Sequence, residues 1–430
     1  MADGNNFTAL LNDAQAVNAD ESPSANAQVD AAVSTCPDVA LNFGVFFDGT
    51  YNNAANVAAF NSGTTSQTGG SYDNYITNVA RLSQQYYTFD DDVPNDCGQP
   101  GEAYRSTYVP GIGSSNGKPD DAAAGATGFG KYGLENAIEK ATQDLREAID
   151  DFGGPASIRS IKLDIFGFSR GAATARVFAN IIAQGELANA EVRFLGLYDT
   201  VGSFGLPGDD TEYNTGEDIA NFLCEVNLGL SPMCLLVPKQ ETADLDVRAS
   251  TATNVFHIVG DDEFRAFFPL SSVKPGHGVE VVMPGCHGDV GGSSPPAEYF
   301  EETMNPPRFL LERGYWDNGV RLDIAPTNNV DRLMRNWDYK YRRTIEPGIW
   351  IAGYTAMLKR AQSAGVPLHS NAVTIPDDLK DLTALMIDGK SLPESERRII
   401  RTNFVRMSHA GVGPNMLDVN GAREIYPNQP

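Results

Sequence analysis

Positively charged residues are scarce in this chain of 430 residues. It has 32 Lys and Arg against 56 Asp and Glu, which gives a net charge of −24 at pH 7. Nucleic-acid binding requires cations that neutralise phosphates, so this balance argues against a nucleic-acid partner. The first Lys or Arg is Arg81, so the N-terminus lacks the basic region of a Sec signal, and we expect synthesis in the cytoplasm without Sec export.

Long apolar runs and paired cysteines are also lacking. No run approaches the roughly 18 to 20 apolar residues that cross a bilayer, which argues against an integral membrane protein. The five cysteines form no C-x-x-C pair, so they indicate neither a zinc site nor a dense disulfide framework, and we interpret them as free thiols. We expect no metal and no cofactor.

The chain is long for one compact core, and we favour a single core with insertions. Apolar strands alternate with helical patterns, which predicts an α/β-hydrolase-like fold with a mostly parallel central sheet and helices on both faces. The expected strands include 39–47, 104–109, 161–168, 192–198, 255–259 and 279–283. We expect a flexible N-terminal tail at 1–38, a catalytic core at 39–292 with a cap insertion at 206–250, and a helical C-terminal part at 293–430. Within that last part, we predict helices across 306–365.

The most informative stretch is LDIFGFSRGAATA, from Leu163 to Ala175. An apolar run leads into Gly167-Phe168-Ser169-Arg170-Gly171, and small residues then open a helix. This strand-turn-helix context is the one that a G-x-S-x-G nucleophile elbow requires. Its glycines give a strained turn room between the flanking strand and helix. We therefore predict that Ser169 is a nucleophile, although an ordinary glycine-flanked turn is the alternative.

Two further polar residues follow predicted strands. Asp199 comes 30 residues after Ser169, and His287 comes 88 residues after Asp199. The order Ser, Asp, His is that of α/β-hydrolases, and the carboxyl ends of parallel strands share one edge of a sheet. In this interpretation His287 is the base and Asp199 orients it. Asp262, with its neighbour Asp261, stays open as an alternative acid, and His409 as an alternative base.

An acyl-transfer site also needs an oxyanion hole made of N–H groups. The backbone N–H of Arg170 follows the nucleophile at a helix N-terminus, and the Gly49-Thr50 turn is the best-placed second source. We expect Asp48, just before this turn, to order it through backbone amides rather than to take part in the chemistry.

Five sequence blocks occur in order between residues 39 and 292: FFDGTYNN, YVPGIG, GFSRGAA, LGLYDTVGSFG and PGCHGDVGG. Together they resemble the phospholipase effectors of type VI secretion systems. The resemblance implies a lipid esterase with the triad Ser169, Asp199 and His287, and a phospholipid membrane surface as substrate. It also implies an antibacterial toxin that acts in the periplasm of a target cell. The implied partners are a carrier of the secretion machinery and a cognate immunity protein.

The insertion contains a nearly uncharged stretch, Ile219 to Val237. A lipase needs an apolar surface that covers the serine and meets a bilayer, so this stretch is a candidate lid, with a core helix as the alternative. The side chains that would form the lid are Phe222, Leu223, Leu228, Leu230, Met233, Leu235 and Leu236.

The leading hypothesis is therefore a serine-dependent phospholipase of the A type. One alternative is a cytoplasmic esterase or thioesterase that acts on a small soluble acyl substrate. The other is a binding module that kept the hydrolase fold and lost turnover.

Overall fold

The computed structural model describes residues 39–88, 101–185, 187, 189–204, 244–293, 300–304, 308–324, 338–370, 373–407 and 423–430. The predicted N-terminal tail, the side chains of the candidate lid and His409 lie outside the described residues. Within the described ranges, no helix is long and apolar enough to cross a membrane.

The centre of the fold is a six-stranded sheet in the order β2-β1-β3-β4-β5-β7, and every neighbouring pair in it is parallel. This confirms the predicted fold class. The strands are β1 (Val39–Phe47), β2 (Gly101–Val109), β3 (Ile158–Phe168), β4 (Ala190–Tyr198), β5 (Asn254–Gly260) and β7 (Val279–Met283). Each was expected from its apolar run, because strands buried on both faces read as nearly continuous apolar sequence.

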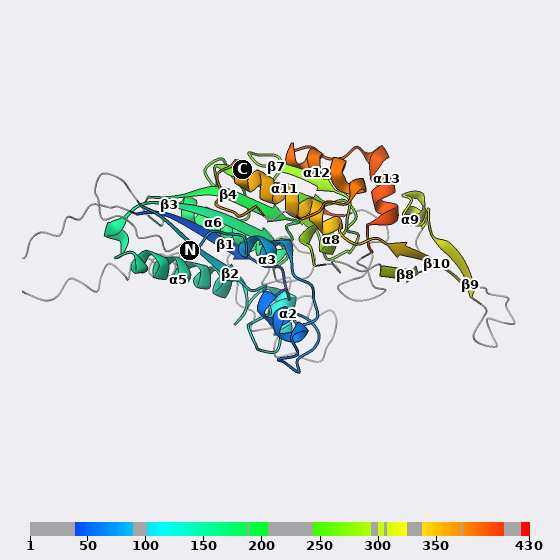
Figure 1. Ribbon diagram of the computed structural model, residues 1–430, viewed down its shortest axis with the longest axis horizontal. Coiled ribbons are helices and arrows are strands. Elements are labelled where there is room, and N and C mark those ends of the chain that lie inside the picture. Colours follow the sequence, from blue (N-terminus) through cyan, green and yellow to red (C-terminus); the bar gives the residue numbers. More distant parts are fainter. Residues whose placement is uncertain are drawn as a thin grey trace, which may run out of the picture.

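Successive side chains of a strand point to opposite faces of the sheet, and β1 shows both faces. Phe43, Val45 and Phe47 belong to one buried cluster, whereas Phe46 belongs to the other. The first face packs against α5 (Leu134–Asp151) and α6 (Arg170–Ala183). The second packs against α3 (Asn78–Ser83) and α11 (Ile349–Ser363), with α12 (Lys380–Ile387) on α11. The sheet is thus buried between two helical layers (Figure 1).

The C-terminal part differs from the prediction. The helix expected from Ile349 onward is confirmed as α11, but 320–324 and 338–345 are strands rather than helices. They form an antiparallel sheet, β8-β10-β9, from β8 (Phe300–Met304), β10 (Asp338–Ile345) and β9 (Val320–Ile324). Figure 1 shows this small sheet extending away from the main one.

The remaining elements are short. The helices are α2 (Ala54–Asn61), α4 (Ala122–Thr127), α8 (His287–Gly291), α9 (Arg308–Glu312) and α13 (Glu394–Asn403). Near the C-terminus, β11 (Ile425–Tyr426) pairs in parallel with β6 (Leu270–Ser271) beside the core. The last described segment therefore returns to the edge of the catalytic core.

Candidate active site

Ser169 occupies the sharp turn between β3 and α6. Its backbone has φ 58° and ψ −129°, a conformation that is strained for any residue with a side chain. The turn fits because its two flanking glycines lack side chains. A Cβ on Gly167 would lie 2.5 Å from the Cα of Ala172, and one on Gly171 would lie 2.3 Å from the carbonyl oxygen of Asp48. The local sequence thus builds the predicted elbow and brings α6 against the end of β1.

Asp199 and His287 are brought together from the ends of β4 and β7. The Nδ1 of His287 lies 2.6 Å from the Oδ2 of Asp199, and both side chains are buried. Asp199 also has a positive φ, 43°. With Nδ1–H directed at the carboxylate, the lone pair of Nε2 is left for a proton from another group.

The surroundings keep Asp199 ionised and His287 neutral. Burial alone would raise the pKa of Asp199, but the charge of Arg423 and the contact with His287 outweigh it and hold that pKa well below its usual range. Burial lowers the pKa of His287, against the opposing effect of Asp199. A neutral imidazole beside a permanent carboxylate is the resting state that a general base requires.

Other residues hold the imidazole from the remaining sides. The backbone N–H of His287 donates to Glu263 Oε2 at 3.2 Å. The ring centroid of Phe168 lies 4.6 Å and that of Phe268 lies 5.2 Å from the imidazole. Burial would raise the pKa of Glu263, but the paired Arg265 lowers it to about 2. The base is thus confined by two rings and one ionised carboxylate.

The loop after β1 lies beside the elbow. The Arg170 Nε donates to the Thr50 hydroxyl at 2.8 Å, and the Gly49 N–H donates to Asp48 Oδ1 at 2.8 Å. Asp48 also accepts from the Tyr108 and Thr77 hydroxyls, at 2.6 and 2.9 Å. Asp48 therefore orders the turn, as expected, but with one backbone amide and two hydroxyls.

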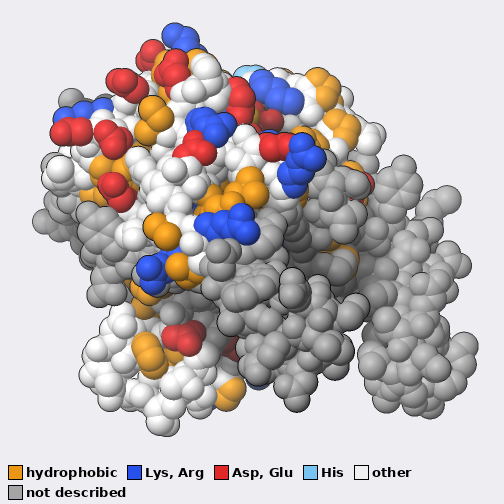
Figure 2. Space-filling model, turned by 90° about the vertical axis from the view of Figure 1, so that its right-hand side faces the viewer, with side chains coloured by type: hydrophobic (Ala, Val, Ile, Leu, Met, Phe, Trp, Pro, Cys, Tyr) orange, Lys and Arg blue, Asp and Glu red, His pale blue; other side chains and the backbone are white. Residues whose placement is uncertain are grey.

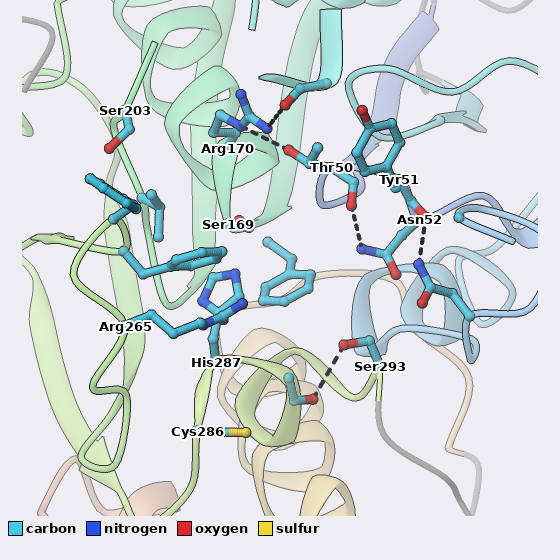
Figure 3. Close-up of a pocket in the computed structure, with 18 of the residues that line it drawn as sticks. Thr50, Tyr51, Asn52, Ser169, Arg170, Ser203, Arg265, Cys286, His287 and Ser293 are labelled. Atoms are coloured by element: carbon cyan, nitrogen blue, oxygen red, sulfur yellow. Dashed lines mark hydrogen bonds between the residues drawn. The ribbon is translucent and has the colours of Figure 1, made fainter. Parts of the chain in front are cut away.

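These groups open on a single cavity of about 650 Å³. Ser169 and His287 face it together, with Thr50, Tyr51 and Arg170 on the opposite wall (Figure 3). Apolar walls come from Phe168, Phe267, Phe268, Val201 and Met407. In the part of the chain that the structure describes, the Ser169 hydroxyl has no hydrogen-bond partner, and no group of His, Cys, Asp and Glu side chains is arranged to hold a metal.

The alternative residues lie elsewhere. Asp262 is buried, but it accepts hydrogen bonds from Arg401 Nε at 2.9 Å and from the N–H of Gly285 at 2.8 Å, not from His287. It supports the histidine loop from behind. His257 lies inside β5 between Thr200 and Glu280, at 3.1 and 3.0 Å, which is a structural arrangement.

Sequence reasoning missed two residues that touch the pair. Glu263 directly follows the acidic residues that were weighed as alternative acids, so its position after a strand was a usable signal. Arg423 donates to both oxygens of Asp199, at 2.7 and 3.0 Å, from 224 residues away in the sequence. No local pattern marks Arg423, because its neighbours fit an ordinary C-terminal segment.

Comparisons with known proteins agree with this geometry. Residues 184–309 match a family model described as "T6SS, Phospholipase effector Tle1-like, catalytic domain". The match includes Asp199 and His287 and ends short of Ser169. It confirms the resemblance to type VI secretion phospholipase effectors and supports a lipolytic hydrolase.

Two solved structures are similar in fold. The structure of "the Tle1 effector bound to the VgrG spike from the Type 6 secretion system" is 20% identical, covers 91% of this chain and 94% of that chain, and has a TM-score of 0.59. An uncharacterized protein from Pseudomonas aeruginosa is 19% identical over 86% of this chain and 53% of that chain, with a TM-score of 0.43. No curated protein matches the chain.

Proposed function

We propose that this chain, which matches the catalytic domain of Tle1-like phospholipase effectors over residues 184–309, is a serine-dependent phospholipase. The observation that carries the proposal is the buried pair Asp199–His287, joined at 2.6 Å, in the same cavity as the strained Ser169. Three groups from three strand ends meet at one edge of a parallel sheet, which is where α/β enzymes place their chemistry.

The roles follow from the geometry. The Ser169 oxygen attacks the carbonyl carbon of an acyl ester while His287 Nε2 takes the hydroxyl proton. His287 then gives this proton to the departing alcohol, and an acyl-serine remains. A water molecule, deprotonated by His287, hydrolyses the acyl-serine and releases a fatty acid. Asp199 stabilises the imidazolium that forms in both steps.

The oxyanion hole is assigned to the backbone N–H groups of Arg170 and Thr50. Among the described residues neither group has a hydrogen-bond acceptor, and both residues line the cavity. The N–H of Gly49, the third candidate, is already used by Asp48. Two donors aimed at one oxygen are the usual provision for a tetrahedral intermediate.

A fatty acyl chain suits the cavity, because its aromatic and aliphatic walls bury apolar surface. The A-type bond, an acyl ester of the glycerol backbone, is the one such a serine site would cut. Delivery by a secretion carrier, action in the periplasm of a target cell and neutralisation by an immunity protein are part of the same proposal. They are supported by the matching family and by the similar effector that is seen on a VgrG spike.

The experiment is release of fatty acid from position-labelled phospholipid vesicles by wild type, Ser169→Ala and Ser203→Ala. Loss of the nucleophile should cost at least about 1,000-fold in kcat. Ser203 lines the same cavity and its hydroxyl has no partner within the described ranges, so its variant should keep turnover. Activity on a soluble short-chain ester without lipid hydrolysis would favour an esterase. Full activity of Ser169→Ala would overturn the proposal.

A further inference from the structure

The last eight residues, 423–430, attach to the catalytic core beside the active site. The N–H of Leu270 donates to the carbonyl of Glu424 at 2.9 Å, and the N–H of Ser272 donates to that of Tyr426 at 2.9 Å. Asn428 is buried and bonds to both backbone groups of Val247, at 2.7 and 2.9 Å. These contacts hold the segment like an added strand with a polar anchor at its end.

The attachment directs one side chain, Arg423, at the acid of the triad. Its Nη1 donates to Asp199 Oδ1 at 2.7 Å and its Nη2 to Asp199 Oδ2 at 3.0 Å. Its Nε donates to the carbonyl of Phe268 at 2.7 Å. Only 8% of the side chain is exposed, so this is a two-pronged, buried ion pair, the geometry in which Arg holds a carboxylate most firmly.

We infer that Arg423 is a positioning residue for the hydrolytic reaction, and that the C-terminal segment is an integral part of the active site. This inference rests on the proposed function, because it assigns Arg423 a role only through Asp199 and His287.

The physical reason lies in how the four lone-pair directions of Asp199 are used. Oδ1 accepts from the N–H of Gly260 at 2.8 Å and from Arg423, and Oδ2 accepts from Arg423 and from His287. Two bonds from a planar guanidinium fix the rotation of the carboxylate, and this sets the direction in which Oδ2 meets the imidazole. Without Arg423, one backbone N–H and the histidine itself would have to hold a buried charge.

Arg423 also sets the balance of charge around the base. The imidazole and the guanidinium share Oδ2, so they are two cationic groups on one carboxylate oxygen when His287 is protonated. A nearby like charge disfavours protonation, so Arg423 helps to keep His287 neutral. The other charged groups that face this pair are Arg265 and Glu263, and Asp289 on α8 lies 3.6 Å from Arg406.

The experiment compares Arg423→Gln, Arg423→Lys, Asn428→Ala and Ser169→Ala with wild type. Arg398→Gln is the matched control, because it removes an Arg from an exposed ion pair with Asp317. The measurements are kcat, KM and the pH profile of kcat/KM on a soluble short-chain ester, with circular dichroism and thermal unfolding for each variant. A soluble ester keeps membrane binding out of the result.

We expect Arg423→Gln to lower kcat about 10- to 100-fold with KM nearly unchanged, because the base loses its orientation. The acidic limb of the profile should move up by about one pH unit, since a cation beside His287 is lost. Arg423→Lys should keep the limb of wild type and recover part of kcat. Asn428→Ala should lower kcat in the same direction by a smaller factor, and Arg398→Gln should behave as wild type.

A folded Arg423→Gln with the kcat and acidic limb of wild type would overturn the inference. So would a loss of activity that only follows the loss of folded protein. If Arg423→Gln does not fold, Arg423→Lys decides: a lowered kcat at unchanged KM supports positioning, and a wild-type kcat refutes it. Activity that survives in Ser169→Ala would instead refute the proposed function.

Discussion

Asp48 shows how one residue near the site couples its geometry to pH. Burial raises the pKa of this carboxyl from its usual 3.8 to about 6, although the hydroxyls of Tyr108 and Thr77 and the N–H of Gly49 lower it. Between these two pH values the folded state binds a proton that the unfolded state has released. Folding stability from this group therefore falls as pH rises from about 4 to 6, by about 3 kcal/mol in total.

We expect Asp48→Asn to remove this dependence. Asn keeps the shape and can still accept from Gly49, but it does not ionise. Urea unfolding between pH 4 and 7 should show that wild type loses stability relative to the variant as pH rises. If the difference between the two proteins stays constant over this range, the raised pKa of Asp48 is refuted.

At the scale of elements, the contact of α6 with the end of β1 depends on a missing side chain. A Cβ on Gly171 would lie 2.3 Å from the Asp48 carbonyl oxygen and 2.5 Å from that of Phe47, both backbone atoms that cannot rotate away. The elbow and the oxyanion loop are therefore held at a distance that only glycine allows.

Gly171→Ala should destabilise the protein by at least about 3 kcal/mol and separate the elbow from the Thr50 loop. Gly353→Ala in α11 is the control, because its Cβ would meet the flexible Met283 Sδ at 3.3 Å and a backbone oxygen at 3.6 Å. The control should stay within about 1 kcal/mol of wild type. Equal unfolding midpoints for the two variants would show that the close approach at Gly171 is not restrictive.

At the scale of the whole molecule, the charge of −24 opposes binding to anionic membranes. Figure 2 shows acidic and basic side chains interspersed over the described part of one face, without a basic area that gathers there. Contact with lipid would then depend on apolar groups, and like charges would slow the approach to an anionic surface until salt screens them.

We expect the rate on anionic vesicles to rise several-fold when the salt concentration goes from about 0.05 to about 0.5 M. The rate on zwitterionic vesicles should change little, and it serves as the control. A rate on anionic vesicles that falls with salt would indicate a basic docking surface and contradict this prediction.

The parts that local pattern could predict are those that depend on near neighbours in the chain. The strands β1 and β7 have the predicted bounds, since a doubly buried strand is marked by its own apolar run. The elbow was visible for the same reason, because Gly167 and Gly171 serve a turn of five residues. The strands β9 and β10 were missed, since their sequences carry no strong alternation and their pairing partners lie elsewhere in the chain.

The sequence by itself determined the α/β class, the order of the elements and the position of Ser169 at a strained turn. Only the tertiary structure decided that Asp199 rather than Asp262 meets His287, that the N–H of Gly49 is occupied, and that Arg423 completes the site. The physical reason is that a turn or strand forms from adjacent residues, whereas a buried carboxylate is satisfied by whichever donors the closed chain brings to it.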